Sequence, residues 1–279
     1  EIIPEMPVEK CNWFSLYNLH HRSVGTFRQG NVFLAGDAAH IHSPAGGQGM
    51  NTGLQDATNL AWKMAGVING HFDERILSTY NTERLPVARE LVKTTDRLFS
   101  MMTSPNRFIR SVRNLILPLF FGLIGRKKIN TTQVFSRVSQ IRIAYRHSPL
   151  SLHLSHKTNI RAGDRLPFLQ VENPKTREVT NIQQWNHGTG FCLLLLDRLN
   201  RIDMPTLRNW LSRNYPTLVD TYYVPYSEVN EPVFSAFEVA EADKKMILVR
   251  PDGYIGLIAD GVDMLLLQRY FQQMVRSGN

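Results

Sequence analysis

A glycine-rich turn, placed between an apolar run and a helical pattern, constrains the fold of this chain more than any other feature. Residues 31–35 (NVFLA) are typical of a buried strand, and Gly36-Asp37 follows at the carboxyl end of this run. Four glycines then leave the backbone bare before the helix begins: Gly46, Gly47, Gly49 and Gly53. The positive end of a helix and its free N–H groups attract anions, so the turn predicts a site for an anion or a polar ligand.

The spacing of these glycines is not the dinucleotide-binding fingerprint G-x-G-x-x-G, because Thr52 stands where the last glycine would be. The residues alone leave two interpretations open. The turn is either a ligand-binding loop or a glycine-rich helix cap beside a buried aspartate.

The segment after the turn is predicted to be an amphipathic helix that ends at Gly70. Its apolar residues recur at helical spacing: Leu54, Ala57, Leu60, Ala61, Met64, Ala65 and Ile68. We expect this face to be buried. We expect Asp56, Asn59 and Lys63 to face away from it.

Further along the chain, the pattern changes from long helices to a mixture of strands and helices. A second helix is predicted over residues 74–102, kinked or split by Pro86, with more helix over 106–146. Strands are predicted over 191–196, 221–224, 245–250 and 254–258, and helices over 205–213 and 262–275. This order predicts a C-terminal α/β or α+β domain of about 120 residues.

The net charge of +8 lies in one segment, because residues 96–150 hold ten Lys and Arg against one acid. A nucleic-acid binder would spread its charge over the main fold, so we expect no nucleic-acid partner. The basic and apolar stretch 97–146 is either a helix on a membrane surface or, as we favour, a face packed on a neighbouring domain. No apolar run approaches the roughly 20 residues that a membrane-spanning helix needs.

Cys11 and Cys192 are the only cysteines, so no CxxC exists and both a dithiol site and a cysteine-based zinc site are excluded. Two sparse cysteines are typical of reduced thiols, and we expect a cytoplasmic protein. His40 and His42 flank Ile41 without a third ligand at a matching spacing, so we predict no metal site.

The run from Val32 to Lys63 resembles the second flavin-binding motif of the FAD-dependent aromatic hydroxylases, the class A flavoprotein monooxygenases that include the p-hydroxybenzoate and phenol hydroxylases. In that family a GD motif precedes a P-x-G-G-Q-G-M-N-x-G loop, and the match here is nearly unbroken. Residues 82–88 (TERLPVA) resemble the family's E-R-x-P-V-A, and 139–150 resemble the segment before its C-terminal domain. Residues 248–255 (LVRPDGYI) resemble the last hairpin of the phenol hydroxylase-like members.

The resemblance implies an α/β fold in two domains. Residues 1–150 would be the C-terminal part of a p-hydroxybenzoate hydroxylase-like FAD-binding domain with long helices. Residues 151–279 would be a thioredoxin-like α/β domain that lacks CxxC. In the cofactor site, Asp37 would accept hydrogen bonds from a ribityl hydroxyl of FAD, Gly36 would lie near the pyrophosphate, and Pro44 would pack close to the isoalloxazine ring. The backbone facing the pyrimidine edge of the ring would be that of Gly46, Gly47, Gln48, Gly49, Met50 and Asn51.

The resemblance also implies the activity, a monooxygenase that hydroxylates an aromatic, phenol-like substrate with NAD(P)H and O₂. The family's G-x-G-x-x-G loop is absent from this sequence, so we expect the chain to be the C-terminal half of such an enzyme and an upstream half to be its partner. A homodimer is a further expected partner arrangement. No catalytic acid or base is assigned. A non-catalytic subunit and a membrane-surface hydroxylase of a quinone precursor are the alternatives.

Overall fold

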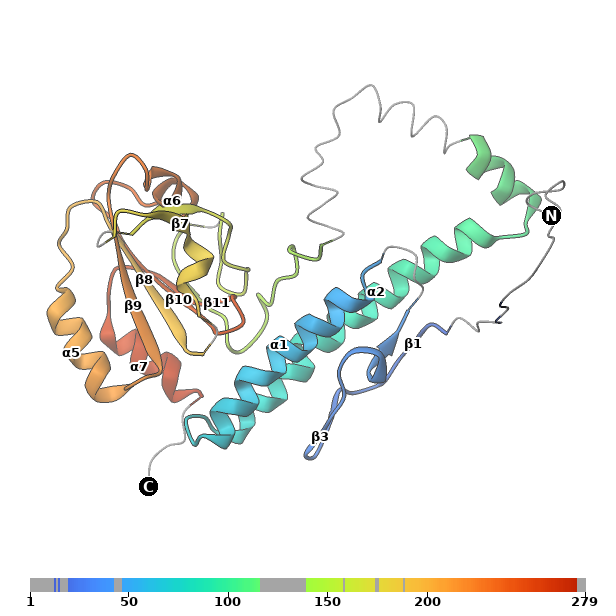
Figure 1. The fold of residues 1–279 in the computed structure, drawn as a ribbon, viewed down its shortest axis with the longest axis horizontal. Coiled ribbons are helices and arrows are strands. Elements are labelled where there is room, and N and C mark those ends of the chain that lie inside the picture. The colour runs from blue at the N-terminus through green and yellow to red at the C-terminus, as the bar shows by residue number, and fades with distance from the viewer. Residues whose placement is uncertain are drawn as a thin grey trace.

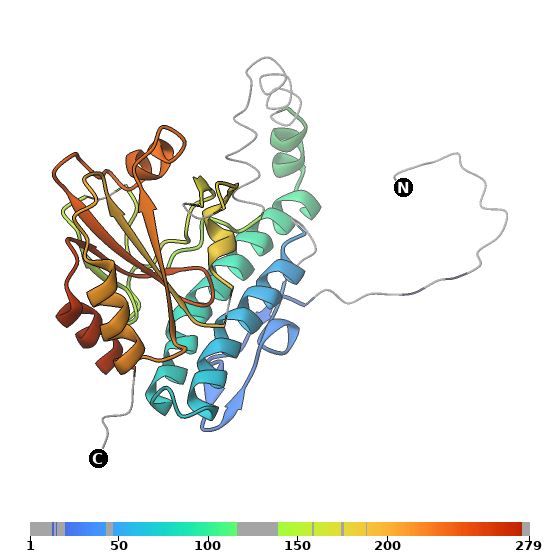
Figure 2. The same cartoon turned by 60° about the vertical axis from the view of Figure 1, so that its left-hand side comes forward.

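The computed structural model describes residues 13, 15, 20–42, 47–115, 139–157, 159–173, 176–187 and 189–274. Short strands and two long helices form an N-terminal part, and a mixed sheet with its helices forms a C-terminal part (Figure 1). The pair of long helices lies between the short strands and the C-terminal part (Figures 1 and 2). None of the described helices combines the length and the apolarity that crossing a membrane requires.

The strands of the N-terminal part are all two residues long. β1 (Arg22–Ser23) pairs antiparallel with β4 (His40–Ile41), and β2 (Arg28–Gln29) pairs antiparallel with β3 (Val32–Phe33). The prediction of a buried strand over residues 31–35 was therefore wrong in length and burial. β3 pairs with β2 alone in the described chain, and the side chain of Val32 is 64% exposed.

Two antiparallel helices follow the short strands. α1 (Gly49–Ile68) leads through the 3-10 helix η2 (Glu74–Leu77) into α2 (Ser78–Thr103). Gly70 has a φ of +74° just beyond α1, which confirms the predicted helix stop. Pro86 lies inside α2, which continues to Thr103 and is not split. A small core holds the short strands against the helices: Phe27, Ala39, Leu60, Tyr80, Leu85 and Ala88.

The predicted orientation of α1 was wrong. Asp56, Asn59 and Lys63 are buried, whereas Leu54 is 60% and Ile68 78% exposed. Charged and polar partners from α2 and the C-terminal part surround the three polar side chains, which removes the cost of burying them. Most of the predicted apolar face lies open in this chain: Leu54, Ala57, Ala61, Ala65 and Ile68. We call these five residues the apolar stripe of α1.

The prediction of further helix over 106–146 is confirmed only in part. Residues 107–115 are helical, and residues 139–146 form turns and irregular structure. Residues 116–138, which include much of the basic segment, lie outside the described residues.

The C-terminal part is built on a five-stranded mixed sheet with the order β5-β11-β10-β8-β9. Its strands are β5 (Leu152–Leu154), β8 (Phe191–Asp197), β9 (Val219–Pro225), β10 (Lys244–Val249) and β11 (Ile255–Asp260). β8 and β9 are parallel, and β10 and β11 form the predicted antiparallel hairpin. A small ribbon adds β6 (Gln170–Glu172) and β7 (Val179–Asn181), followed by the 3-10 helix η3 (Ile182–Trp185). The predicted strands are thus confirmed, each within a few residues of its expected bounds.

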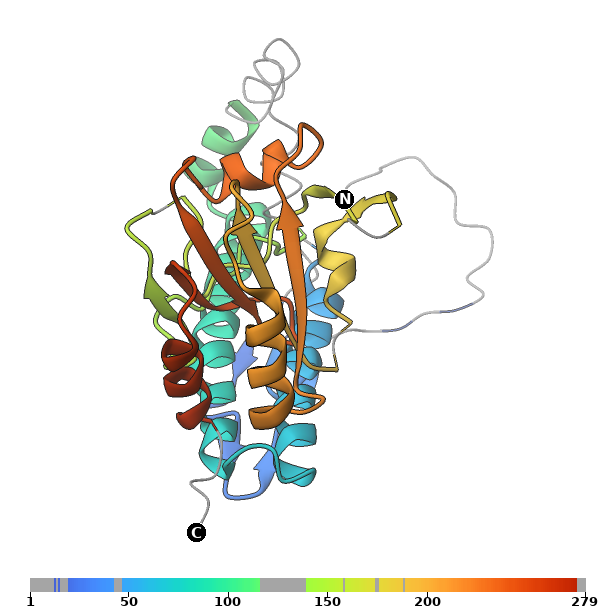
Figure 3. The same cartoon turned by 90° about the vertical axis from the view of Figure 1, so that its left-hand side faces the viewer.

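Helices cover both faces of this sheet because successive residues of a strand point to opposite faces. α5 (Met204–Asn214) and α7 (Met264–Gln272) lie side by side and pack on the core that contains Leu193 and Leu195 (Figure 3). α6 (Glu231–Ala236) packs on the core that contains Leu194 and Leu196. The predicted helices over 205–213 and 262–275 correspond to α5 and α7.

Apolar side chains from the N-terminal part extend the first of these cores. Trp62 of α1 meets Phe191 of β8 edge to face, with ring centroids 5.7 Å apart. Phe72, Ile76 and Leu77 belong to the same core. The two parts of the chain therefore share one apolar core.

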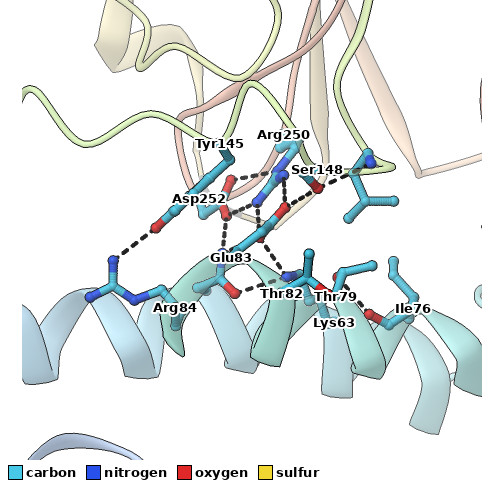
Figure 4. Close-up of polar contacts among 12 residues, drawn as sticks. Lys63, Ile76, Thr79, Thr82, Glu83, Arg84, Tyr145, Ser148, Arg250 and Asp252 are labelled. Atoms are coloured by element: carbon cyan, nitrogen blue, oxygen red, sulfur yellow. Dashed lines mark hydrogen bonds and ion pairs between the residues drawn. The ribbon is translucent and has the colours of Figure 1, made fainter. Parts of the chain in front are cut away.

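A buried ion cluster joins the two parts beside this core (Figure 4). The carboxylate of Glu83 on α2 accepts hydrogen bonds from Lys63 Nζ at 2.7 Å and from Arg250 at 2.6 and 3.0 Å. Arg250 also pairs with Asp252 in the turn of the hairpin. Glu83, Lys63 and Arg250 have fully buried side chains.

Candidate functional site

The Gly36-Asp37 turn packs closely on the first turns of α1. The 3-10 helix η1 (Gly36–Ala38) begins at Gly36, whose φ of +58° favours glycine. A Cβ on Gly53 would lie 3.4 Å from the Cα of Gly36. Two bare backbones therefore approach each other at the position where the resemblance places the cofactor.

Asp56 of α1 holds this turn in place. One oxygen of its carboxylate accepts a hydrogen bond from the backbone N–H of Gly36 at 3.1 Å and lies 2.8 Å from His40 Nε2. The other oxygen accepts from Arg84 Nε at 2.6 Å. Burial alone would raise the pKa of Asp56, but the hydrogen bond with His40 and the charge of Arg84 hold it below its usual value.

The role of Asp56 was missed at the sequence level because an acid between apolar positions is normally assigned to a solvated helix face. A pattern in the sequence could have found it. Asp56, Asn59 and Lys63 share one helix face. On the next helix, Glu83 has the charge opposite to Lys63, and Arg84 has the charge opposite to Asp56. Two complementary polar rows on consecutive helices indicate a buried contact.

Asp37 lies on the surface of the turn. Its side chain is exposed, and no hydrogen bond or ion pair to it forms within the part of the chain that the structure describes. Its carboxylate is therefore open to hydroxyl donors from a ligand.

The start of α1 presents bare backbone next to this turn. Gly47 has a φ of +62°, and open space surrounds the position of a Cβ there. The residue before the helix, Gln48, gives no side-chain cap, and the first turn of the helix contains no acid. The first N–H groups of a helix have no partner within it, so those of Gly49, Met50 and Asn51 are suited to a negatively charged or carbonyl edge.

Gln140 fixes the start of α1 from the segment that leads into the C-terminal part. Its side chain donates to Thr52 Oγ1 at 2.7 Å and to Gln48 Oε1 at 3.2 Å. Met50, in the first turn of α1, is 77% exposed. Pro44 and Gly46, two of the predicted cofactor contacts, lie outside the described residues.

These features fit a cofactor that carries hydroxyl groups and an electron-rich ring edge. The described residues bring Gly36, Asp37 and the first turn of α1 together, as the resemblance implies. His40 forms a hydrogen bond with Asp56. The described residues contain no group of three His, Cys, Asp or Glu side chains that could hold a metal ion.

Two protein families match separate segments of the chain. Residues 2–95 match the FAD binding domain family, and residues 197–279 match the phenol hydroxylase C-terminal dimerisation domain. The first segment contains the Gly36-Asp37 turn and most of the two long helices. The second contains most of the five-stranded sheet.

Individual relatives extend this similarity along the chain. A rifampicin monooxygenase of Rhodococcus hoagii is 45% identical over 254 residues, which are 91% of this chain and 44% of that protein. Pentachlorophenol 4-monooxygenase of Sphingobium chlorophenolicum is 35% identical over 169 residues, which are 59% of this chain and 29% of that protein.

The fold agrees with that of solved hydroxylases. OxyS anhydrotetracycline hydroxylase from Streptomyces rimosus superimposes with a TM-score of 0.67 at 27% identity, covering 92% of this chain and 47% of that one. CabE, an aromatic hydroxylase from angucycline biosynthesis, gives a TM-score of 0.65 at 28% identity, with coverage of 89% and 46%. The chain thus spans about half the length of these solved relatives. Its turn, its two matched segments and its overall similarity relate the chain to the FAD-dependent aromatic hydroxylases.

Proposed function

We propose that this chain contributes the second FAD-binding turn and the C-terminal domain of a monooxygenase that hydroxylates an aromatic, phenol-like substrate with NAD(P)H and O₂. The observation that carries the proposal is the Gly36-Asp37 turn, held against the bare start of α1 within the segment that matches the FAD binding domain family. The names of the relatives, which include a pentachlorophenol and two rifampicin monooxygenases, support an aromatic substrate.

In this proposal, the exposed carboxylate of Asp37 accepts hydrogen bonds from the ribityl chain, and the bare backbone at Gly36 leaves room for the pyrophosphate. The backbone of Gly47, Gln48, Gly49, Met50 and Asn51 faces the pyrimidine edge of the ring, where the positive end of α1 stabilises negative charge. We also propose that Pro44 packs close to the isoalloxazine ring and that the backbone of Gly46 faces its pyrimidine edge. When bound, FAD supplies the redox and oxygen chemistry, and this chain binds it and holds it in place.

Two partners belong to the proposal. The apolar stripe of α1 is an exposed row of five apolar residues, which supports contact with an upstream half of the enzyme. The match to a dimerisation domain supports a homodimer. The predicted domain boundary at 150/151 and the thioredoxin-like character of the second domain stay predictions. So does the cytoplasmic location, which the buried free thiol of Cys192 supports.

Binding and turnover test the proposal directly. FAD is titrated into the chain, with and without the upstream half, and followed by the quenching of flavin fluorescence. NAD(P)H oxidation is then measured with a series of phenols under ¹⁸O₂, and mass spectrometry of the product follows. The proposal predicts FAD binding and a product that carries one ¹⁸O atom. If FAD binds neither to the chain alone nor to the chain with the upstream half, the alternative of a non-catalytic subunit is favoured.

A further inference from the structure

We propose that Tyr145 positions the Gly36-Asp37 turn from the C-terminal part of the chain, acting through Arg84 and Asp56. The inference concerns three buried side chains outside the predicted cofactor contacts. It rests on the proposed function only for its cofactor readout, because the geometry of the turn can be measured without any ligand.

Tyr145 belongs structurally to the C-terminal part. Its backbone N–H donates to the carbonyl of Gly163 at 2.7 Å, and its ring lies on that of Tyr254, with centroids 4.3 Å apart. The guanidinium of Arg250 lies 5.5 Å from the centroid of the same ring. Only 4% of Tyr145 is exposed, so its position follows that of the hairpin and the loop against which it packs.

The hydroxyl of Tyr145 reaches across the junction to Arg84 on α2 (Figure 4). Arg84 Nη1 donates to this hydroxyl at 2.9 Å, Nε donates to Asp56, and Nη2 donates to the carbonyl of Thr52 at 3.2 Å. The side chain of Arg84 is fully buried. Because a guanidinium is a rigid planar fork, contacts at its other nitrogens fix the direction in which Nε meets Asp56.

Asp56 passes this constraint to the turn. The oxygen that faces Arg84 and the oxygen that holds the N–H of Gly36 belong to one carboxylate. If the guanidinium tilts, that carboxylate must rotate or lose one of its two sets of partners. Gly36 directly precedes Asp37, so its backbone sets the direction of the proposed ribityl contact.

A purely structural role for Tyr145 would be to hold the two parts of the chain together. The ion cluster around Glu83 already does this, because Arg250 of the C-terminal part donates two hydrogen bonds to the carboxylate of Glu83 on α2. Removal of the Tyr145 hydroxyl leaves that cluster and the shared apolar core intact. Tyr145→Phe should therefore change the turn without separating the two parts.

Tyr145→Phe is compared with Tyr223→Phe as a matched control. Tyr223 lies in the same part of the chain, and its hydroxyl also makes hydrogen bonds, to the carbonyl of Asp197 and to Asn200, away from the turn. The first readout is hydrogen exchange of the Gly36 amide in the chain without ligand. The second is FAD affinity, measured in the preparation that binds FAD.

We expect the Gly36 amide to exchange about tenfold faster in Tyr145→Phe, which is near the lower end of the range for one lost hydrogen bond to a charged group. The FAD affinity of Tyr145→Phe should fall about three- to tenfold. Tyr223→Phe should lose a similar amount of thermal stability, but its Gly36 amide exchange and its FAD affinity should stay unchanged. In an Asp56→Asn background, Tyr145→Phe should add little, because the contact that carries its effect is already altered.

Equal exchange of the Gly36 amide in the two tyrosine variants and the wild type would overturn the inference. So would full additivity of Tyr145→Phe and Asp56→Asn. Loss of the proposed function has a different signature. A wild type that binds no FAD would contradict the proposed function, and the exchange measurement would still decide whether Tyr145 positions the turn.

Discussion

Glu83 and Arg84 are neighbours in sequence, yet their side chains serve different contacts. Glu83 joins α2 to the hairpin of the C-terminal part through Arg250, and Arg84 holds Asp56 and with it the Gly36-Asp37 turn. Their resemblance to the family's E-R-x-P-V-A motif was visible in the sequence. The contact of Glu83 with Arg250 was not, because Arg250 reaches α2 only when the two parts of the chain meet.

Replacing Glu83 by Gln should destabilise the chain strongly. Lys63 and Arg250 would each lose a charged partner in a fully buried position, and breaking a buried ion pair costs about 3–5 kcal/mol. Urea unfolding measures the change in the free energy of unfolding. Glu74→Gln is the matched control, because Glu74 is 59% exposed in its pair with Arg28 and such pairs contribute about 0–1 kcal/mol. Similar losses in the two variants would contradict this account of the cluster.

The same carboxylate predicts the response to acid. Burial would raise the pKa of Glu83, but the charges of Arg250 and Lys63 outweigh it and hold this pKa below its ordinary value of 4.5. A pKa that is lower in the folded state contributes stability above the unfolded value, and this contribution is lost as the pH falls. The free energy of unfolding should therefore decrease below about pH 4.5, and less steeply in Glu83→Gln. Parallel curves for the two proteins would show that Glu83 is not the group responsible.

At the scale of elements, four strands of the five-stranded sheet and the helices α5 and α7 were predicted from the sequence, whereas β5, β6, β7, α6 and the orientation of α1 were not. β8, β10 and β11 are continuous apolar runs, and such runs mark buried strands wherever they pack. α1 has an apolar row and a polar row, and periodicity alone cannot say which one is buried. Ion pairs with α2, together with a hydrogen bond from Asn59 to Asp252 of the hairpin, favour burial of the polar row.

The contact of α1 with the loop that follows it depends on Gly66. A Cβ at this position would lie 1.9 Å from the ring of Phe72, a residue of the shared apolar core. Gly66→Ala should therefore lower stability by about 1–3 kcal/mol through overpacking, although alanine favours a helix interior by about 1 kcal/mol. Thermal unfolding compares it with Gly25→Ala, where open space surrounds the new methyl group. An unchanged or higher Tm for Gly66→Ala would show that Phe72 moves aside freely.

At the scale of the whole molecule, the two parts share a core and an ion cluster, while the apolar stripe of α1 stays open. An upstream half that covers the stripe would explain why apolar residues remain exposed there. The stripe was visible in the sequence as a helical period, but its exposure required the structure.

Ala57→Lys tests this interpretation of the stripe. Because Ala57 is exposed, the stability of the chain should change by no more than about 0.5 kcal/mol. Association with the proposed upstream half, measured by co-purification and by titration calorimetry, should weaken. Ala242→Lys places the same charge at an exposed position of the C-terminal part and should leave association unchanged. Equal association of both variants would place the contact elsewhere.

The most direct test of the central claim is FAD affinity in wild type and Asp37→Ala, measured by fluorescence quenching on the chain together with the proposed upstream half. The side chain of Asp37 is exposed, so Asp37→Ala should leave thermal stability unchanged. We predict that FAD affinity falls by about 1.5–3 kcal/mol, the range for a lost hydrogen bond to a charged group, which is roughly a tenfold to hundredfold rise in Kd. An unchanged FAD affinity in Asp37→Ala would contradict the assignment of the Gly36-Asp37 turn as the flavin-binding turn of this chain.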